Sequence, residues 1–88
     1  MAGPKFTSFT LTYNTQNLVP ASPISSRQAL KIFNTDMTYT LYYGDSAVNA
    51  TTGIPITAGN ESDWLPGNGW YVFCANPSGS TCIAGEVG

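Results

Sequence analysis

The chain has 88 residues, which is enough for one small hydrophobic core and too few for two. Charged residues make up 9% of it, the formal net charge is −2, and histidine is absent. Its three cations, Lys5, Arg27 and Lys31, cannot form a basic track along phosphates, so we expect no nucleic-acid partner. Without histidine there is no Ser-His or Cys-His pair, and we expect no enzyme activity. No apolar run approaches the roughly 20 residues of a membrane span.

A first strand is predicted in the run KFTSFTLTY, because Phe9, Leu11 and Tyr13 alternate with serine and threonine. This alternation is typical of a half-buried strand with its hydroxyl face outward. The following run, NTQNLVPASPISS, is predicted to be a loop, since its two prolines exclude a central strand. Residues 1–26 are therefore interpreted as an N-terminal strand or arm followed by a proline-rich loop.

The run RQALKIFN predicts a second strand, residues 27–34, with Leu30 and Ile32 on one face. A short helix capped by Ser26 is the alternative. The letters NTD indicate a tight turn, and MTYTLYYG, residues 37–44, indicates a third strand. Because the turn is short, we expect these two strands to pair as a hairpin.

The stretch YGDSAVNATTGIPITAGNES raises the question of whether it is a ligand site or a connection. A phosphate loop needs a lysine, and none occurs here. A calcium loop of the EF-hand type needs regularly spaced oxygen ligands, whereas Asp45 and Asn49 are isolated and Glu61 is distant. We interpret the stretch as a connection whose Ile54 and Ile56 touch the core. A weaker oxygen-ligand site at Asp45 is the alternative, and we expect neither a metal nor a cofactor.

The C-terminal third alternates short apolar runs with turns. SDWLPGNGWYVFCA contains a short extended piece, a turn at residues 66–69 and the most apolar strand of the chain. NPSGS is a further turn, and TCIAGEVG is the last strand. In total, six to eight short strands without a substantial helix predict an all-β domain. We expect a small antiparallel β-sandwich or a partly closed barrel, with residues 27–88 forming the core of a single domain.

Cys74 and Cys82 flank the turn NPSGS. If the strands on either side pair as a hairpin, Cys74 faces Cys82, at a Cα separation of about 4.5–5.5 Å that allows a disulfide. Such a bridge would contribute roughly 2–3 kcal/mol of stability. Two reduced, buried cysteines are the alternative. Two thiols without histidine do not make a zinc site.

Two tyrosines, Tyr42 and Tyr71, are out of phase with the main apolar faces of their strands and are expected on the surface. The N-terminal strand is expected either to pair with the sheet edge of a neighbouring molecule or to begin its own sandwich. Aromatic residues that fill both faces of a thin sandwich are the alternative to an aromatic patch. The predicted interface residues are Phe6, Phe9, Leu11, Tyr42, Trp64 and Tyr71.

The order of the segments IFN, LYYGD, TTGIPITAGNES and WYVFCANPSGSTCIAGEV resembles that of small structural proteins of tailed-bacteriophage virions. The resemblance covers about residues 27–87; it departs from the pattern at Asn60, where glutamate is expected, and in its two cysteines. It implies a compact β-sandwich without catalytic residues that binds other virion proteins, as decoration proteins, head fibres and tail attachments do.

The resemblance and the composition together lead to one expected function. We expect a capsid decoration or cement protein that binds the major capsid protein, forms a symmetric homo-oligomer and is located in the virion after synthesis in the host cytoplasm. The N-terminal run MAGPKFTSF has no apolar core of a signal peptide, in line with cytoplasmic synthesis. The alternative function is a carbohydrate-binding or lectin-like module that uses exposed tyrosine and tryptophan.

Overall fold

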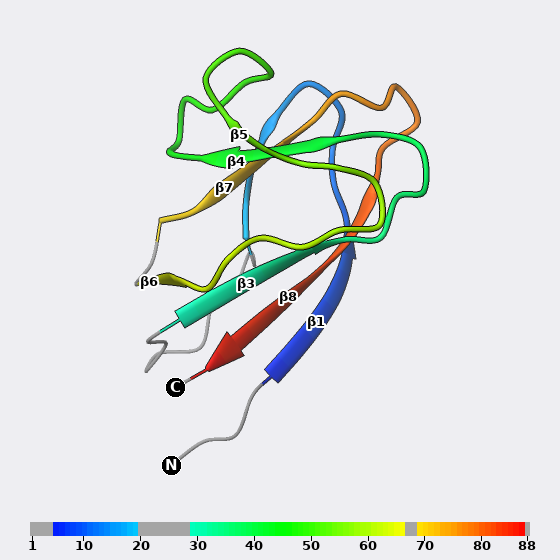
Figure 1. The fold of residues 1–88 in the computed structure, drawn as a ribbon. Helices are drawn as coiled ribbons and strands as arrows, with labels where there is room; N and C mark the ends of the chain where they lie inside the picture. Colours follow the sequence, from blue (N-terminus) through cyan, green and yellow to red (C-terminus); the bar gives the residue numbers. More distant parts are fainter. Residues whose placement is uncertain (1–4, 20–28, 67–68, 88) are drawn as a thin grey trace.

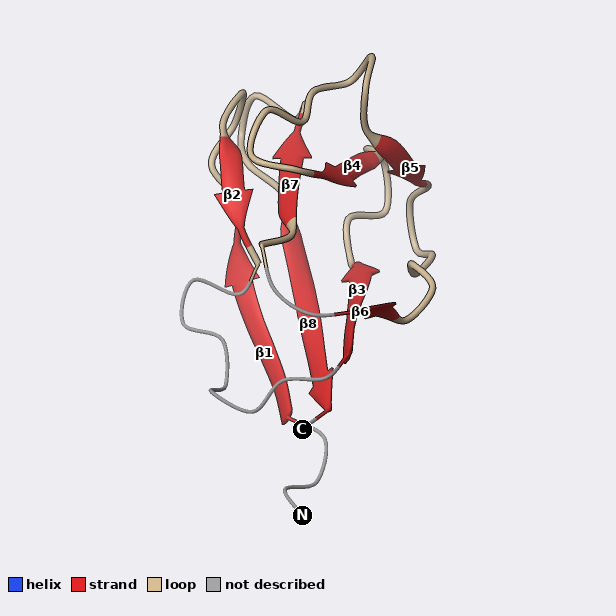
Figure 2. Ribbon diagram, turned by 90° about the vertical axis from the view of Figure 1, so that its left-hand side faces the viewer, coloured by secondary structure: helices blue, strands red, loops and turns tan. Residues whose placement is uncertain are grey.

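The computed structural model describes residues 5–19, 29–66 and 69–87. In these residues it contains eight strands and no helix, so no described helix could span a membrane. The strands form two four-stranded sheets, called here sheet A (order β1-β8-β3-β6) and sheet B (order β2-β7-β4-β5) (Figures 1 and 2). Their bounds are β1 Lys5–Thr10, β2 Gln16–Leu18, β3 Ala29–Asn34, β4 Leu41–Gly44, β5 Ile54–Ile56, β6 Leu65–Pro66, β7 Tyr71–Cys74 and β8 Thr81–Val87.

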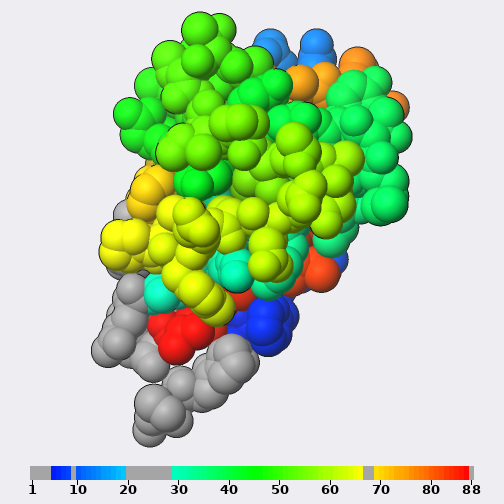
Figure 3. Space-filling view, viewed as in Figure 1, coloured from blue at the N-terminus to red at the C-terminus, as the bar shows by residue number. Residues whose placement is uncertain are grey.

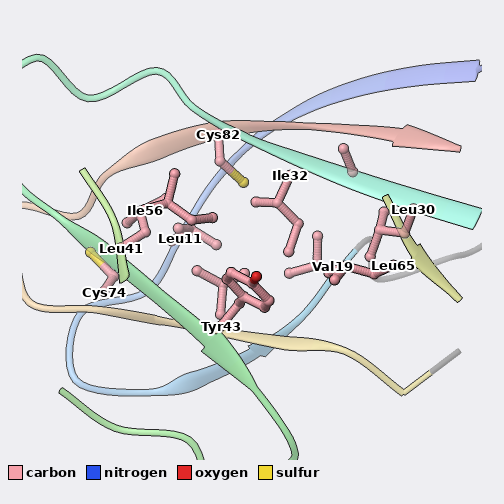
Figure 4. Packing of buried hydrophobic residues seen from close by; sticks show 12 residues of the cluster. Leu11, Val19, Leu30, Ile32, Leu41, Tyr43, Ile56, Leu65, Cys74 and Cys82 are labelled. Atoms are coloured by element: carbon pink, nitrogen blue, oxygen red, sulfur yellow. The ribbon is translucent and has the colours of Figure 1, made fainter. Parts of the chain in front are cut away.

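All pairings between these strands are antiparallel, and the two sheets enclose one hydrophobic core, so the predicted small β-sandwich is confirmed. Alternation of side chains explains how the core forms. In β3, Leu30 and Ile32 point inward and are fully buried, as predicted; in β4, Leu41 and Tyr43 do the same. Each fully buried aliphatic side chain contributes about 1.5–3 kcal/mol. The core residues are Leu11, Val19, Leu30, Ile32, Leu41, Tyr43, Ile56, Leu65, Val72, Cys74, Cys82 and Ala84 (Figure 4).

The predicted hairpin of residues 27–44 is wrong. Strand β3 pairs with β8 and β6 in sheet A, whereas β4 pairs with β7 and β5 in sheet B. Residues 35–40 cross from one sheet to the other (Figure 1). The crossing is held by Asn34, whose buried side-chain amide donates to the carbonyl oxygens of Tyr39 and Ile56, both at 2.9 Å. Both apolar strand faces are buried because they face each other across the core.

The predicted hairpin around the turn NPSGS is also wrong. Strand β7 belongs to sheet B and β8 to sheet A, so Cys74 lies opposite Leu41, while Cys82 lies opposite Asn34. Both cysteines are free and buried, as the alternative interpretation expected, and their sulfur atoms stand apart in Figure 4. The turn changes sheets at Gly79, which has a φ of 81° and whose added Cβ would lie 2.8 Å from the backbone oxygen of Leu11.

Strand β1 pairs with β8 along all six of its residues and is therefore the first strand of its own sandwich, the alternative to an arm. Residues 16–18, predicted as loop, form the edge strand β2 on β7. Two side chains predicted to face inward, those of Tyr13 and Ile54, are 47% and 53% exposed. Residues 29–34 form a strand and not a helix. Residues 26–28, which the helical alternative also included, lie outside the described residues. Residues 67 and 68 of the predicted turn lie outside them as well.

Candidate functional site

The loop of residues 45–53 folds over the outer face of sheet B and buries Val48. Glycine at position 53 allows this close approach, because a Cβ there would lie 2.5 Å from Cβ of Tyr42. The side chain of Gln16 on β2 donates from Nε2 to the backbone oxygen of Val48 at 2.8 Å. Residues 45–53 therefore act as a structural cover over sheet B. Ile54, which was predicted to touch the core, is instead exposed.

The polar oxygens of this loop are used in its own turns. Oδ1 of Asp45 accepts from the backbone N–H of Ala47 at 2.9 Å. Oδ1 of Asn49 accepts from the backbone N–H groups of Thr51 and Thr52, at 2.8 and 2.9 Å. Among the described residues, no three acidic, cysteine or histidine side chains gather as a metal site would require. Asx turns account for these side-chain oxygens, and backbone hydrogen bonds from Val48 to Asp45 and from Gly53 to Asn49 complete the loop, so no bound ion is needed to explain its geometry.

The outer face of sheet B contains two of the predicted interface residues. Tyr42 lies opposite Phe73, and Tyr71 lies opposite Gly44, so both tyrosines point to the same side of the sheet. Both are half-buried. Leu18 on β2 lies opposite Tyr71 and is more exposed. Sequence reasoning missed Leu18 because it falls in the segment that was predicted to be a loop.

The outer face of sheet A carries a group of apolar side chains. We define the sheet A face as Phe6 on β1, Phe33 on β3, Ile83 on β8 and Met37 in the 35–40 loop. These side chains line a hollow of about 500 Å³ that is closed on another side by residues 59–61. In Figure 3, the blue atoms of β1 and the lime atoms near residue 60 lie on this same side of the molecule.

A flat floor supports the two phenylalanine rings of the sheet A face. Gly85 on β8 lies beneath them: a Cβ there would be 2.9 Å from the ring of Phe6 and 3.3 Å from the ring of Phe33. The ring centroids are 6.2 Å apart and the planes are tilted by 55°. This distance and tilt are favourable for an aromatic pair. Phe6 remains 60% exposed, so its outer ring surface is available for contact.

One ion pair lies at the rim of the hollow. Nζ of Lys31 is 3.1 Å from Oε1 of Glu61 and 5.3 Å from the ring centroid of Trp64. The cation therefore neutralises Glu61 and covers one side of the indole. Trp64, a predicted interface residue, is 50% exposed beside this pair.

A polar cluster anchors the wall of the hollow that carries Met37. Oδ1 of Asp36 accepts from the backbone N–H groups of Thr38 and Tyr39 at 2.8 and 2.9 Å. Its Oδ2 accepts from the hydroxyl of Ser80 at 2.6 Å and the amide of Asn76 at 3.1 Å. These hydrogen bonds, that of Ser80 first, hold the pKa of Asp36 well below its usual value. The cluster fixes the loop to the turn between the two sheets.

The two cysteines offer no reactive group on the surface. Both side chains are fully buried in the core. Burial raises the pKa of the Cys82 thiol to about 12, with a smaller contribution from Cys74. A buried, protonated thiol is a poor nucleophile. These residues therefore act as small apolar core side chains.

The predicted interface residues do not form one patch. Phe6 and Trp64 lie on the outer side of sheet A, and Tyr42 and Tyr71 on that of sheet B. The prediction that Leu11 is an interface residue is wrong. Its side chain is 1% exposed, and a core side chain cannot contact a partner. The backbone of Phe9 pairs with β8, and its side chain lies outside the described part of the structure.

Three residues of the sheet A face, Phe33, Met37 and Ile83, were not predicted. For Phe33 a signal existed, because it is out of phase with its buried neighbours Leu30 and Ile32 in the same way as Tyr42 is in β4.

Comparison of the chain with protein-family models, curated proteins and solved structures gives no match.

Proposed function

We propose that this chain is a non-enzymatic structural protein of a tailed-phage virion, most specifically a capsid decoration protein that binds the major capsid protein. One observation carries the proposal: a small domain with few charges exposes many large apolar side chains. In the described residues these are Phe6, Tyr13, Leu18, Met37, Tyr39, Ile54 and Trp64. Such a surface favours association, because little charge repulsion opposes contact and apolar area is removed from water.

The polar part of the surface supports the same proposal. Serine and threonine together number 19 in the chain, against eight charged residues, and among the described ones only Ser62 and Ser80 are buried. Short hydroxyl side chains lose little conformational entropy when another protein covers them, whereas lysine or glutamate loses up to about 2 kcal/mol. A rigid sandwich with such a surface can be covered at low cost on more than one side.

The virion setting rests on the resemblance of residues 27–87 to structural proteins of tailed phages. In the structure, the best-matching segment, TTGIPITAGNES, includes β5 and the wall of the hollow at residues 59–61. The segment thus supplies β5 of sheet B, and Glu61 forms a bridge to Phe33 of β3 in sheet A. This position is consistent with a framework segment of a small sandwich.

The carbohydrate-binding alternative needs aromatic rings that are open for stacking on a shared platform. One side of the Trp64 ring is covered by Lys31, and Trp64 lies on the other sheet from Tyr42 and Tyr71. Both tyrosines are half-buried. This arrangement does not favour a sugar platform, so we do not propose that function.

Co-sedimentation with capsids assembled from the major capsid protein of the same phage tests the proposal. We expect the wild-type chain to sediment with the capsids. The variant Leu18→Glu, on the sheet B side, is expected to bind at least about tenfold more weakly if that side meets the shell, because it places a charge in the contact. Ser78→Glu, in an exposed turn, is the matched charge control.

Absence of sedimentation by the wild-type chain would contradict the proposed function. A glycan screen with the same preparation then tests the alternative. Binding to capsids that is equally weakened by Leu18→Glu and Ser78→Glu would indicate a general charge effect and would remove the sheet B side as the shell contact.

A further inference from the structure

We propose that the sheet A face is a two-fold interface between two copies of this chain. This inference deepens the proposed function by naming a partner and a surface, and it rests on that function only for the expectation of a symmetric oligomer. The sheet B side then remains open for the shell. The partner, a second copy, follows from the shape, charge and area of the face.

Shape gives the first argument. An interface with two-fold symmetry uses the same patch on both copies, so the patch must be complementary to itself, and a projection beside a hollow meets this condition. Met37 is 83% exposed and lies at the edge of the hollow, with Phe6 on another side. The hollow of about 500 Å³ has room for a methionine side chain from a second copy. Methionine is suited to this because its flexible thioether fills irregular spaces.

The hollow is already formed before any partner arrives. Its floor consists of β1, β8 and β3, paired over six residues on each side of β8. Its wall at Met37 is fixed by Asp36, whose carboxylate anchors the loop and whose backbone oxygen accepts from the N–H of Gly59 at 3.1 Å. Preformed surfaces lose less entropy on binding.

Charge gives the second argument. The charged groups at the rim, Lys31 and Glu61, have opposite sign and are already 3.1 Å apart. Asp36, in the wall, accepts four hydrogen bonds from within the chain. Each sheet A face therefore carries one net negative charge, that of Asp36, and this charge is held by four internal hydrogen bonds, so the repulsion between two faces is small. Two-fold symmetry also allows Lys31 of one copy to pair with Glu61 of the other.

Area gives the third argument. Phe6 and Met37, in the sheet A face, and Trp64, beside the ion pair at its rim, are 60%, 83% and 50% exposed. With about 150–250 Å² of surface for each large side chain, they expose roughly 290–480 Å² together. A stable interface buries about 800 Å² on each partner. These three side chains thus supply about half of the need, and polar neighbours in the rim, such as Thr35 and Asn60, are available for the rest.

Light scattering over a concentration series, with reductant present, measures the mass of the chain in solution. We expect a species of about twice the chain mass of 9.3 kDa. Met37→Glu should raise the dissociation constant of the dimer at least about tenfold, because each interface would then bury two unpaired carboxylates. Ile54→Glu is the matched control: this exposed isoleucine lies on β5 of sheet B, and its replacement should leave the mass unchanged.

A second variant, Phe6→Glu, keeps the test independent of any local effect in the loop, and circular dichroism shows whether each variant is folded. A wild-type chain that stays monomeric to roughly millimolar concentration would overturn the inference. So would a dimer that persists in both folded variants. A dimer that does not bind capsids supports this inference and contradicts the proposed function, whereas a monomer that binds capsids does the reverse.

Discussion

Replacing Asp36 by asparagine is expected to lower the free energy of unfolding by about 2 kcal/mol at pH 7. The asparagine Oδ1 can still accept from the backbone N–H groups of Thr38 and Tyr39. Its amide, however, would face the amide of Asn76, and two donors cannot bond. Ser80 would have to turn its hydroxyl from donor to acceptor.

The magnitude follows from these lost interactions. A hydrogen bond to a charged group contributes about 1.5–3 kcal/mol, and partial access of water places this site toward the lower end. The total stability of a domain of this size is about 4–13 kcal/mol, so a loss of 2 kcal/mol is readily measured. Urea unfolding followed by tryptophan fluorescence gives the difference. Asp45→Asn is the matched control, because Asp45 is exposed and its carboxylate accepts one hydrogen bond, from the backbone N–H of Ala47; the substitution should change stability by less than about 0.5 kcal/mol.

The pH dependence gives a second, independent readout. Since the folded-state pKa of Asp36 is lowered, its stabilising contribution is complete above the unfolded pKa of about 3.9 and is lost as the pH falls through the folded value. The difference in the free energy of unfolding between wild type and Asp36→Asn should therefore be largest at neutral pH and decrease below about pH 4. A gap smaller than about 0.5 kcal/mol at pH 7, or one that stays constant down to pH 2, would refute this reasoning.

Two further predictions concern the packing. Gly53→Ala should lower the free energy of unfolding by about 2–3 kcal/mol, because the new Cβ would lie 2.5 Å from Cβ of Tyr42. Gly59→Ala should lower it by only about 1 kcal/mol through backbone strain, because Gly59 has a φ of 76° and no atom lies within 4 Å of the new Cβ. Urea midpoints compare the two, and equal losses would contradict the described approach of the 45–53 loop. The Cys82 thiol, with a pKa of about 12, should react with a thiol reagent at pH 8 only after unfolding. Rapid labelling of folded protein would contradict its burial.

For β3, the sequence was sufficient to predict which side of the strand faces the core, although for Tyr13 and Ile54 the same reasoning failed. The alternation around Leu30 and Ile32 identified the inner face of β3, and the most apolar run became β7. Alternation fixes the face of a strand because side chains repeat every two residues, but it carries little information on which strand lies alongside. The pairing of β3 with β8 and of β4 with β7 therefore could not be predicted from these patterns.

The same limit applied to the hollow on sheet A. Phe6, Phe33 and Ile83 are far apart in the sequence and meet only because β1, β8 and β3 are adjacent. The tight turn predicted at residues 34–36 was wrong for a related reason. Asn34 and Asp36 are typical of tight turns, but their side chains hold a loop that crosses between the sheets.

A titration of capsids with the purified chain tests the central claim most directly, by measuring how many copies sediment with each capsid. A decoration protein occupies equivalent positions on a symmetric shell, so binding should saturate at a fixed ratio of this chain to the major capsid protein. Lack of binding, or binding that increases without saturation, would contradict the account.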